Sequence, residues 1–204
     1  MSFSSYRGLK AELALWLKRT DLTTNIVDFI ALAESRMNHE LRLRRQITTT
    51  TLVTVANDQD VTLPTDFLEF ENLTLQSSPP ASLSVVTPEI LDRKFPASFQ
   101  TGMPQVYAPI GNVIRLGPTP DAAYNIAADY YAKWDLATTQ ESNWLLTNYP
   151  VIYLAGAMME ASAYLFDDQA MARWEARFRA EMDAVQKADD MALRSGSAMR
   201  VRAL

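Results

Sequence analysis

The stretch from Val151 to Phe166 most constrains the fold of this chain, because it is apolar around nearly its whole circumference. Only Glu160 and Ser162 interrupt it, and Pro150 stands before it at a position that the first turn of a helix accepts. A surface helix of a monomer has one apolar stripe and one charged face, so this helix must be covered on several sides. A membrane span takes roughly 20 apolar residues, and this segment is shorter and interrupted. We therefore expect a core helix or a subunit contact.

The composition fits one ordinary domain, or one core that carries a sizeable insertion. The chain has 204 residues, of which 48% are hydrophobic. Its N-terminus has neither the basic start nor the apolar segment of a secretory signal, so we expect a soluble protein that is not exported. The chain has no cysteine, which excludes a disulfide framework, a thiolate zinc site and a cysteine nucleophile.

Helical periodicity occupies both ends of the chain. A serine cap followed by leucines at helical spacing predicts a helix over residues 5–19, and a second helix is predicted over 26–43. The polar turn between them is short, so the two helices should pack as a hairpin. A long helix should begin after Asp167 and end near Gly196, with one apolar stripe facing the core. That stripe consists of Met171, Trp174, Phe178, Met182 and Val185.

The middle of the chain changes to the β-branched pattern of strands. One hairpin is predicted from residues 47–55 with 61–63, and a second from 105–108 with 113–116. Together the predicted elements are short antiparallel strands that interrupt the helical sections. The remaining elements are strands at 67–75, 83–86 and 124–131 and a short helix at 88–95.

These patterns predict an α+β fold. We expect an antiparallel helical bundle of two N-terminal and two C-terminal helices, an inserted antiparallel β-rich region and an extended C-terminal tail. The tail alternates apolar and basic residues, which is typical of a strand, and it has no evident local partner. The expected boundaries are 1–45 for the N-terminal hairpin, 46–134 for the β-rich insertion, 135–195 for the C-terminal helices and 196–204 for the tail.

Charge is distributed unevenly along the chain, whose net charge is −5. Residues 47–140 carry four basic against ten acidic residues, whereas the segment before them has a basic excess. An acidic protein is a poor candidate for duplex binding, which depends on clustered Lys and Arg. The cluster of Arg36, Arg42, Arg44 and Arg45 fits a solvated or intersubunit salt-bridged face better than a nucleic-acid contact.

Few residues are candidates for catalysis or for ligand binding. His39 is the only histidine, and without a serine or metal partner it fits a surface or interface position better than a general base. The scattered glycines form no phosphate-binding loop. Asp58, Asp60 and Asp66 lack the spacing of a calcium loop, so a turn is the preferred interpretation. We expect no cofactor, no metal and no enzymatic activity.

Five segments of the chain carry motifs that occur in one order in a known family. They are Phe29–Arg36 with Glu40–Arg42, Leu63–Leu68, Leu116–Pro120, Tyr130–Ala132, and Asn143–Leu146 with Pro150, Tyr153 and Leu154. Together they resemble the head-to-tail adaptor proteins of short-tailed bacteriophages, a family that includes tail tubular protein A. The resemblance covers about residues 5–190 in collinear order, and each motif alone is weak.

The resemblance implies a structural protein of the virion that is made in the cytoplasm of the host bacterium. It implies a dodecameric ring that binds the portal protein, joins it to the tail nozzle protein and encloses the channel for double-stranded DNA, without sequence-specific DNA binding and without a membrane. No residue is catalytic in this family as a class. The C-terminal tail is expected to contact the portal, by strand addition to a partner edge. The predicted portal contacts are Met199, Arg200, Val201, Arg202, Ala203 and Leu204.

A ring also requires contacts between neighbouring copies, in which each subunit uses two different faces. The small residues on one side of the apolar helix over residues 151–166 suit close approach by a neighbouring element. Exposed arginines suit ion pairs between subunits. The predicted subunit interface consists of Arg36, Arg42, Ala155, Gly156, Ala163, Arg173 and Arg177.

Two other functions stand as alternatives. The first is a peptidoglycan hydrolase that uses paired carboxylates as acid and base, alone or as a second activity of an adaptor. The second is a small nucleic-acid-binding accessory protein, whose affinity would fall steeply with salt. The candidate residues are Glu34 with Glu40 or Asp66 with Glu69 for the hydrolase, and Arg42, Arg44 and Arg45 for the accessory protein.

Overall fold

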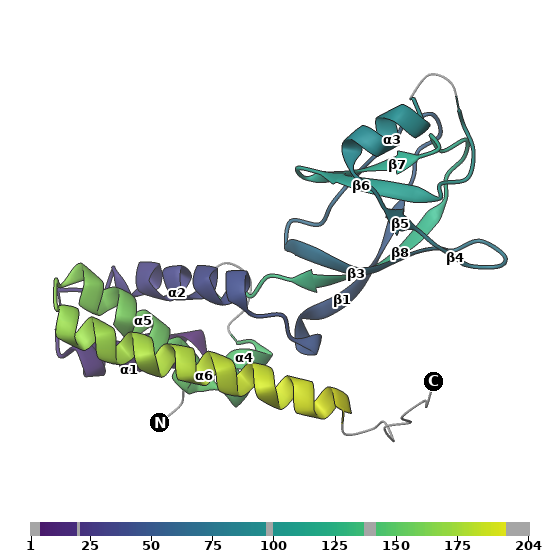
Figure 1. Ribbon diagram of the computed structural model, residues 1–204. Coiled ribbons are helices and arrows are strands. Elements are labelled where there is room, and N and C mark those ends of the chain that lie inside the picture. Colours follow the sequence, from purple (N-terminus) through teal and green to yellow (C-terminus); the bar gives the residue numbers. More distant parts are fainter. Residues whose placement is uncertain (1–4, 20, 97–99, 137–141, 195–204) are drawn as a thin grey trace. The chain divides into compact units, whose positions relative to one another are not determined.

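The computed structural model describes residues 5–19, 21–96, 100–136 and 142–194. The fold is α+β, with six α-helices and two β-sheets in the described residues (Figure 1). The chain forms two compact units. The helical unit combines Met1–Arg45 with Trp134–Leu204, and the β unit consists of Gln46–Lys133.

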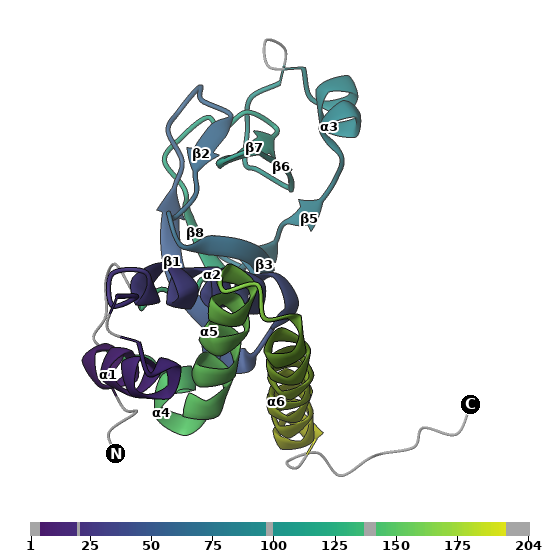
Figure 2. The ribbon, with the colours of Figure 1, turned by 90° about the vertical axis from the view of Figure 1, so that its left-hand side faces the viewer.

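The helical unit is built around α5, on which both α2 and α6 pack (Figure 1 and Figure 2). Helices α1, α4 and α5 begin at residues suited to that position. The Ser5 side chain accepts a hydrogen bond from Gly8 N at 3.1 Å, Asn143 Oδ1 accepts one from Leu146 N at 2.7 Å, and Pro150 is the first residue of α5. The helices are α1 Tyr6–Leu17, α2 Ile26–Glu40, α4 Trp144–Asn148, α5 Pro150–Tyr164 and α6 Asp168–Arg194.

The expectation that α5 belongs to the core is confirmed. Ten of its residues are buried, including the whole Tyr153 side chain. Gly156 shows how closely its neighbours approach, because a Cβ added there would lie 2.8 Å from Ala33 Cβ in α2 and 2.9 Å from the Phe178 ring in α6. The predicted stripe of α6 also faces this core, where Phe178, Met182 and Val185 are buried. None of the described helices has the length and apolar character of a membrane span.

Two helix boundaries differ from the prediction. α2 ends at Glu40 rather than near residue 43, because Leu41 has an extended backbone with ψ of 136°. The predicted start at Pro150 is confirmed, but a separate short helix, α4, precedes it. Tyr149 breaks the helix between them, as expected for a residue that precedes proline. The helical unit therefore has five helices in its described residues instead of four.

The β unit contains two four-stranded sheets, ordered β1-β8-β3-β4 and β2-β7-β6-β5. Their apolar side chains share one core, which includes Leu73, Ile114 and Ile126. Helix α3, Pro88–Lys94, is capped by Thr87 and packs against β6 (Figure 1). The strands are β1 Ile47–Val53, β2 Asp60–Thr62, β3 Phe67–Leu75, β4 Ala81–Ser82, β5 Ser84–Val85, β6 Val106–Ile110, β7 Val113–Gly117 and β8 Asn125–Ala132.

The strands exist close to where they were predicted, but part of their pairing was predicted wrongly. The hairpin of β6 and β7 is confirmed, with Ile110 opposite Val113 and Gly111 at φ of 60° in the turn. The hairpin of β1 with β2 is wrong, because β1 pairs with β8 and β2 pairs with β7. The sheets are also not wholly antiparallel, since β5 runs parallel to β6.

Candidate functional site

The most unusual polar group of the helical unit is the buried carboxylate of Glu34 in α2, whose residue is only 4% exposed. Its Oε1 accepts a hydrogen bond from the Tyr153 hydroxyl of α5 at 2.9 Å. Leu136 N donates to both carboxylate oxygens, at 3.0 and 3.2 Å. Asn143, the cap of α4, donates from Nδ2 to the Tyr153 hydroxyl at 2.7 Å. One carboxylate thus joins α2, α5, the start of α4 and the chain that returns from the β unit.

Burial dominates the electrostatics of this network. It raises the pKa of Glu34 from its ordinary value of 4.5 to about 7, against the lowering effect of the hydrogen bonds from Tyr153 and Leu136. Burial first, and then the charge of Glu34, holds the pKa of Tyr153 well above 10.0. The same two causes raise the pKa of Tyr6, whose hydroxyl is buried without a hydrogen-bond partner among the described residues. Glu34 can therefore gain or lose a proton near neutral pH while it remains in the core.

A second polar pair strengthens the attachment of the returning chain to α2. Asn38, one turn after Glu34, donates from Nδ2 to the Trp134 carbonyl at 2.9 Å. Its Oδ1 accepts a hydrogen bond from Trp134 N at 2.8 Å. The side-chain amide of Asn38 thus bonds to both the N–H and the C=O of Trp134, as a neighbouring strand would. The two bonds fix both the position and the direction of the Trp134 backbone. We call the set of Glu34, Asn38, Asn143 and Tyr153 the clasp.

The motifs of the β unit also serve to hold backbone and side chains in place. Asp66 Oδ1 accepts a hydrogen bond from the Tyr130 hydroxyl at 3.0 Å, and the Asp66 carbonyl accepts one from Lys133 N at 2.8 Å. Burial, followed by the hydrogen bond to Asp66, raises the pKa of Tyr130 to about 12. Gly117 lies so close to the Phe95 ring that an added Cβ would approach it to 2.7 Å. Close packing therefore requires glycine at this position.

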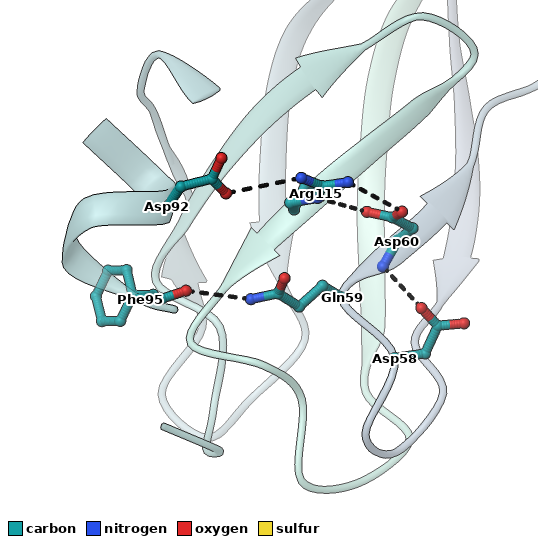
Figure 3. A network of polar contacts seen from close by, with 6 residues as sticks. All are labelled: Asp58, Gln59, Asp60, Asp92, Phe95 and Arg115. Carbon is teal, nitrogen blue, oxygen red and sulfur yellow. Dashed lines mark hydrogen bonds and ion pairs between the residues drawn. The ribbon is translucent and has the colours of Figure 1, made fainter. Parts of the chain in front are cut away.

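A pocket of the β unit, with a volume of about 360 Å³, lies around the guanidinium of Arg115. Arg115 forms ion pairs with Asp60, at 3.0 Å, and with Asp92, at 3.6 Å (Figure 3). Asp58 accepts a hydrogen bond from Asp60 N at 3.0 Å, as expected for the turn predicted there. Arg115 thus neutralises part of the acidic lining. The lining residues are Asn57, Asp58, Gln59, Asp60, Asp92, Arg115 and Thr119.

The structure gives little support to the residues that the hydrolase alternative needs. Glu34 is buried, whereas Glu40 is exposed, so the two carboxylates do not line one surface. Asp66 accepts its hydrogen bond from Tyr130, and Glu69 is exposed on β3. His39 is also exposed, with Nδ1 2.6 Å from the Ser35 carbonyl. Within the described residues, no group of three His, Asp or Glu side chains is placed to hold a metal ion.

The four arginines of the cluster do not lie on one helix, because α2 ends before Arg42, Arg44 and Arg45. Each has contacts within the chain. Arg36 Nε forms an ion pair with Glu160 at 2.6 Å, and Arg44 Nε forms one with Asp189 at 3.1 Å. Arg42 donates hydrogen bonds to the Asn38 and Leu41 carbonyls. The Arg45 guanidinium lies over the Trp144 ring.

The residues predicted for the subunit interface have different surroundings. Ala155 and Gly156 are enclosed within the chain, and the close approach expected at Gly156 is made by Ala33 and Phe178 of the same copy. Ala163, Arg173 and Arg177 are exposed, and Arg42 is half-buried. The predicted portal contacts, Met199, Arg200, Val201, Arg202, Ala203 and Leu204, lie outside the described residues.

The clasp was not predicted as a unit, although three of its members lie in the motifs that carried the resemblance. Glu34 belongs to the first motif, and Asn143 and Tyr153 belong to the last. Their appearance in these motifs was the available signal. It indicated the family, but it did not reveal that the side chains meet.

Comparison of the sequence with known protein families shows to which family the chain belongs. The profile of a family described as SU10 adaptor protein matches residues 4–202. The chain belongs to the SU10 adaptor protein family. This result confirms the predicted membership of a bacteriophage head-to-tail adaptor family. No protein of curated function matches the sequence. As an SU10 adaptor family member, the chain is a structural adaptor protein, and its motifs coincide with the buried polar contacts described above.

Proposed function

We propose that this SU10 adaptor family member joins the portal of a bacteriophage head to the tail nozzle, as a dodecameric ring that lines the channel for DNA exit. It acts in the virion and has no enzymatic role. The observation that carries this proposal is the match of the SU10 adaptor profile to residues 4–202, which is nearly the whole chain. Portal and nozzle are the two protein partners in this proposal.

The chemistry of the motif residues supports a structural role. Glu34 and Asp66 are acidic residues of two motifs, and both are held within the chain. Glu34 accepts hydrogen bonds from the Tyr153 hydroxyl and from Leu136 N. The Asp66 side chain accepts one from the Tyr130 hydroxyl, and the Asp66 carbonyl accepts one from Lys133 N. Catalytic carboxylates must instead reach a substrate. The motifs thus serve to hold backbone and side chains in place within each unit, as expected for a structural protein.

The charge of the β unit supports contact with a DNA channel that does not retain DNA. Gln46–Lys133 contains nine acidic and four basic residues, which accounts for the whole net charge of −5. A wall of like charge repels phosphates and weakens adhesion. We propose that the β unit contributes part of this wall and that double-stranded DNA passes without sequence-specific contact.

Different parts of the chain have different roles in this proposal. The two compact units act as domains, with the β unit inserted into the helical unit, and the five described helices form the bundle. Residues 199–204 contact the portal, an assignment that rests on the sequence alone. The exposed or half-buried members of the predicted interface, which the bundle leaves accessible, contact neighbouring copies. They are Arg36, Arg42, Ala163, Arg173 and Arg177.

The proposal is tested by measuring the mass of the chain alone and of its complex with the portal. The purified chain is analysed by native mass spectrometry alone and after mixing with the purified portal of the same phage. We expect a monomer alone and a portal complex that carries twelve copies. Absence of any complex with the portal would refute the proposed function, and a complex with another stoichiometry would refute the dodecamer.

A further inference from the structure

The turn between α5 and α6 contains a residue that the fold itself does not explain. Phe166 has φ of 56°, in the left-handed region, and its ring is 92% exposed. The turn is a Schellman motif, in which Phe166 N donates to the Ala163 carbonyl at 3.1 Å and Asp167 N donates to the Ser162 carbonyl at 3.0 Å. Glycine is the usual residue at this position, because it adopts positive φ without strain.

Phe166 therefore carries two disadvantages for the isolated chain. Its backbone is strained, because an L-residue with a Cβ is disfavoured in the left-handed region. Its ring remains in water, so it contributes little apolar burial to the fold. Strained backbone in an ordered turn is often associated with function. Burial of the ring in a complex would compensate for both disadvantages.

The neighbours of Phe166 define the chemistry of this surface. Tyr164 is 53% exposed and packs its ring on Phe29 of α2, at 5.6 Å between centroids. Asp167 and Asp168 follow directly and are both exposed. We call Tyr164, Phe166, Asp167 and Asp168 the knob. It presents two aromatic rings beside two carboxylates, so its partner should offer aromatic surface beside cations.

The same chain has a surface with the complementary chemistry, where α1 meets α6. Trp16 is 48% exposed and contacts the Trp174 ring edge to face, at 5.7 Å between centroids. The Arg177 guanidinium lies over the Trp174 ring at 5.8 Å, and Arg173 is exposed one turn away. We call Trp16, Arg173, Trp174 and Arg177 the basic aromatic face.

We propose that the knob of one copy packs on the basic aromatic face of the next copy around the ring. Phe166 stacks against the tryptophans, and Asp167 and Asp168 pair with the arginines. Because knob and face are different surfaces of one chain, each copy can use both at once, and the contact is heterologous, as ring closure requires. This inference rests on the proposed ring function and assigns its subunit contact.

Cross-linking tests the contact directly, because the chain has no cysteine of its own. The variant carrying Phe166→Cys and Arg177→Cys is bound to purified portal and mildly oxidised. Within one copy, the helix from Asp168 to Arg177 separates the two positions by about 14 Å, too far for a disulfide, which spans less than about 7 Å between Cα atoms. A disulfide must therefore join two copies. We expect a ladder of covalent multimers on a denaturing gel.

The matched control replaces Arg179 instead of Arg177, in combination with Phe166→Cys. Arg179 is exposed on α6 but points about 200° away around the helix axis. It should give no ladder. Loss of the Phe166 ring should itself lower the number of bound copies, so the ladder is sought among the copies that do bind the portal. If those copies form no ladder, the inferred contact is wrong while the adaptor function stands. If they form dimers only, the contact is isologous and the inference also fails. If the wild type does not bind the portal, the proposed function fails.

A second variant separates folding from assembly. Phe166→Gly removes the strain and the exposed ring, so we expect the Tm of the free chain to be unchanged or about 2 °C higher. The copies bound per portal should fall to fewer than half of the wild-type number. Met191→Ala, which trims another exposed apolar side chain at 70% exposure, should keep the full number. A lower Tm for Phe166→Gly, or full occupancy of the portal, would overturn the inference.

Discussion

Glu34 links helices through its buried carboxylate, and its contribution to the stability of the fold depends on pH. Its carboxylate receives three hydrogen bonds from Tyr153 and Leu136, yet burial still disfavours the charged form. The folded chain therefore binds the Glu34 proton more tightly than the unfolded chain does. The stabilisation linked to this proton is fully present below pH 4.5 and is lost as the pH rises through about 7.

We predict that Glu34→Gln removes this pH dependence. The pKa difference from 4.5 to about 7 corresponds to roughly 3 kcal/mol, at 1.36 kcal/mol per pH unit. The free energy of unfolding of the wild type should decline relative to that of the variant by about this amount between pH 4.5 and pH 8. Urea denaturation of both proteins across this range measures the difference. A constant difference would show that Glu34 titrates normally.

The residue scale is also where prediction from the sequence fell shortest. Glu34 was considered as part of the first family motif and as a candidate acid or base paired with Glu40. Its actual partners, Leu136 and Tyr153, are 102 and 119 residues away. Hydrogen bonds over such separations depend on how the helices pack, and no local pattern encodes that packing.

At the scale of elements, the three helices α2, α5 and α6 approach one another around Gly156. The distances of 2.8 and 2.9 Å from its virtual Cβ to Ala33 and Phe178 leave no room for a methyl group. Helices α2 and α6 are therefore held at a spacing that only glycine permits.

We predict that Gly156→Ala destabilises the chain by about 1–3 kcal/mol, through overpacking between helices. The free energy of unfolding in urea measures the loss. Adding Ala33→Gly should recover part of it, because this change vacates the atom at 2.8 Å. Gly102→Ala is the matched control, since nothing lies within 4 Å of its virtual Cβ. Equal effects of Gly156→Ala and Gly102→Ala would contradict the packing argument.

Elements with local signals were predicted well, and their pairing was not. Pro150 and the caps at Ser5 and Asp167 act on the adjacent turn, so helix starts could be read from the chain. β1 was assigned to the neighbouring β2, because sequence proximity favours hairpins. Its true partner is β8, in register from Ile47 opposite Tyr131 to Val53 opposite Asn125. Nothing in the threonine-rich β1 distinguishes these two pairings locally.

At the scale of the whole molecule, the fold class and the family were both predictable, because motifs are spread over nearly the whole chain. The assignment of Ala155 and Gly156 to contacts between copies shows the limit. An excess of apolar surface reveals that a helix is covered, but it does not reveal which chain covers it. Here α2 and α6 of the same chain do so at Gly156.

We predict that truncation after Arg194 leaves the fold unchanged and abolishes portal binding. The described contacts of α6 end before this residue, with Arg44 pairing Asp189, so the circular dichroism spectrum and the Tm should match those of the intact chain. Native mass spectrometry with purified portal measures the binding. Normal portal occupancy by the truncated chain would refute the role proposed for residues 199–204.

The helical unit is formed by segments from both ends of the chain, and this has a consequence for its folding during synthesis on the ribosome. The segment carrying α1 and α2 emerges first, but α5, which covers its apolar side, follows only after the whole β unit. At about 5–20 residues per second, synthesis of the roughly 90 residues from Gln46 to Lys133 takes several seconds. During that delay Glu34 remains in water as an ordinary carboxylate, and nascent α2 exposes apolar surface to chaperones. The β unit can close during this interval, and the bundle is completed last.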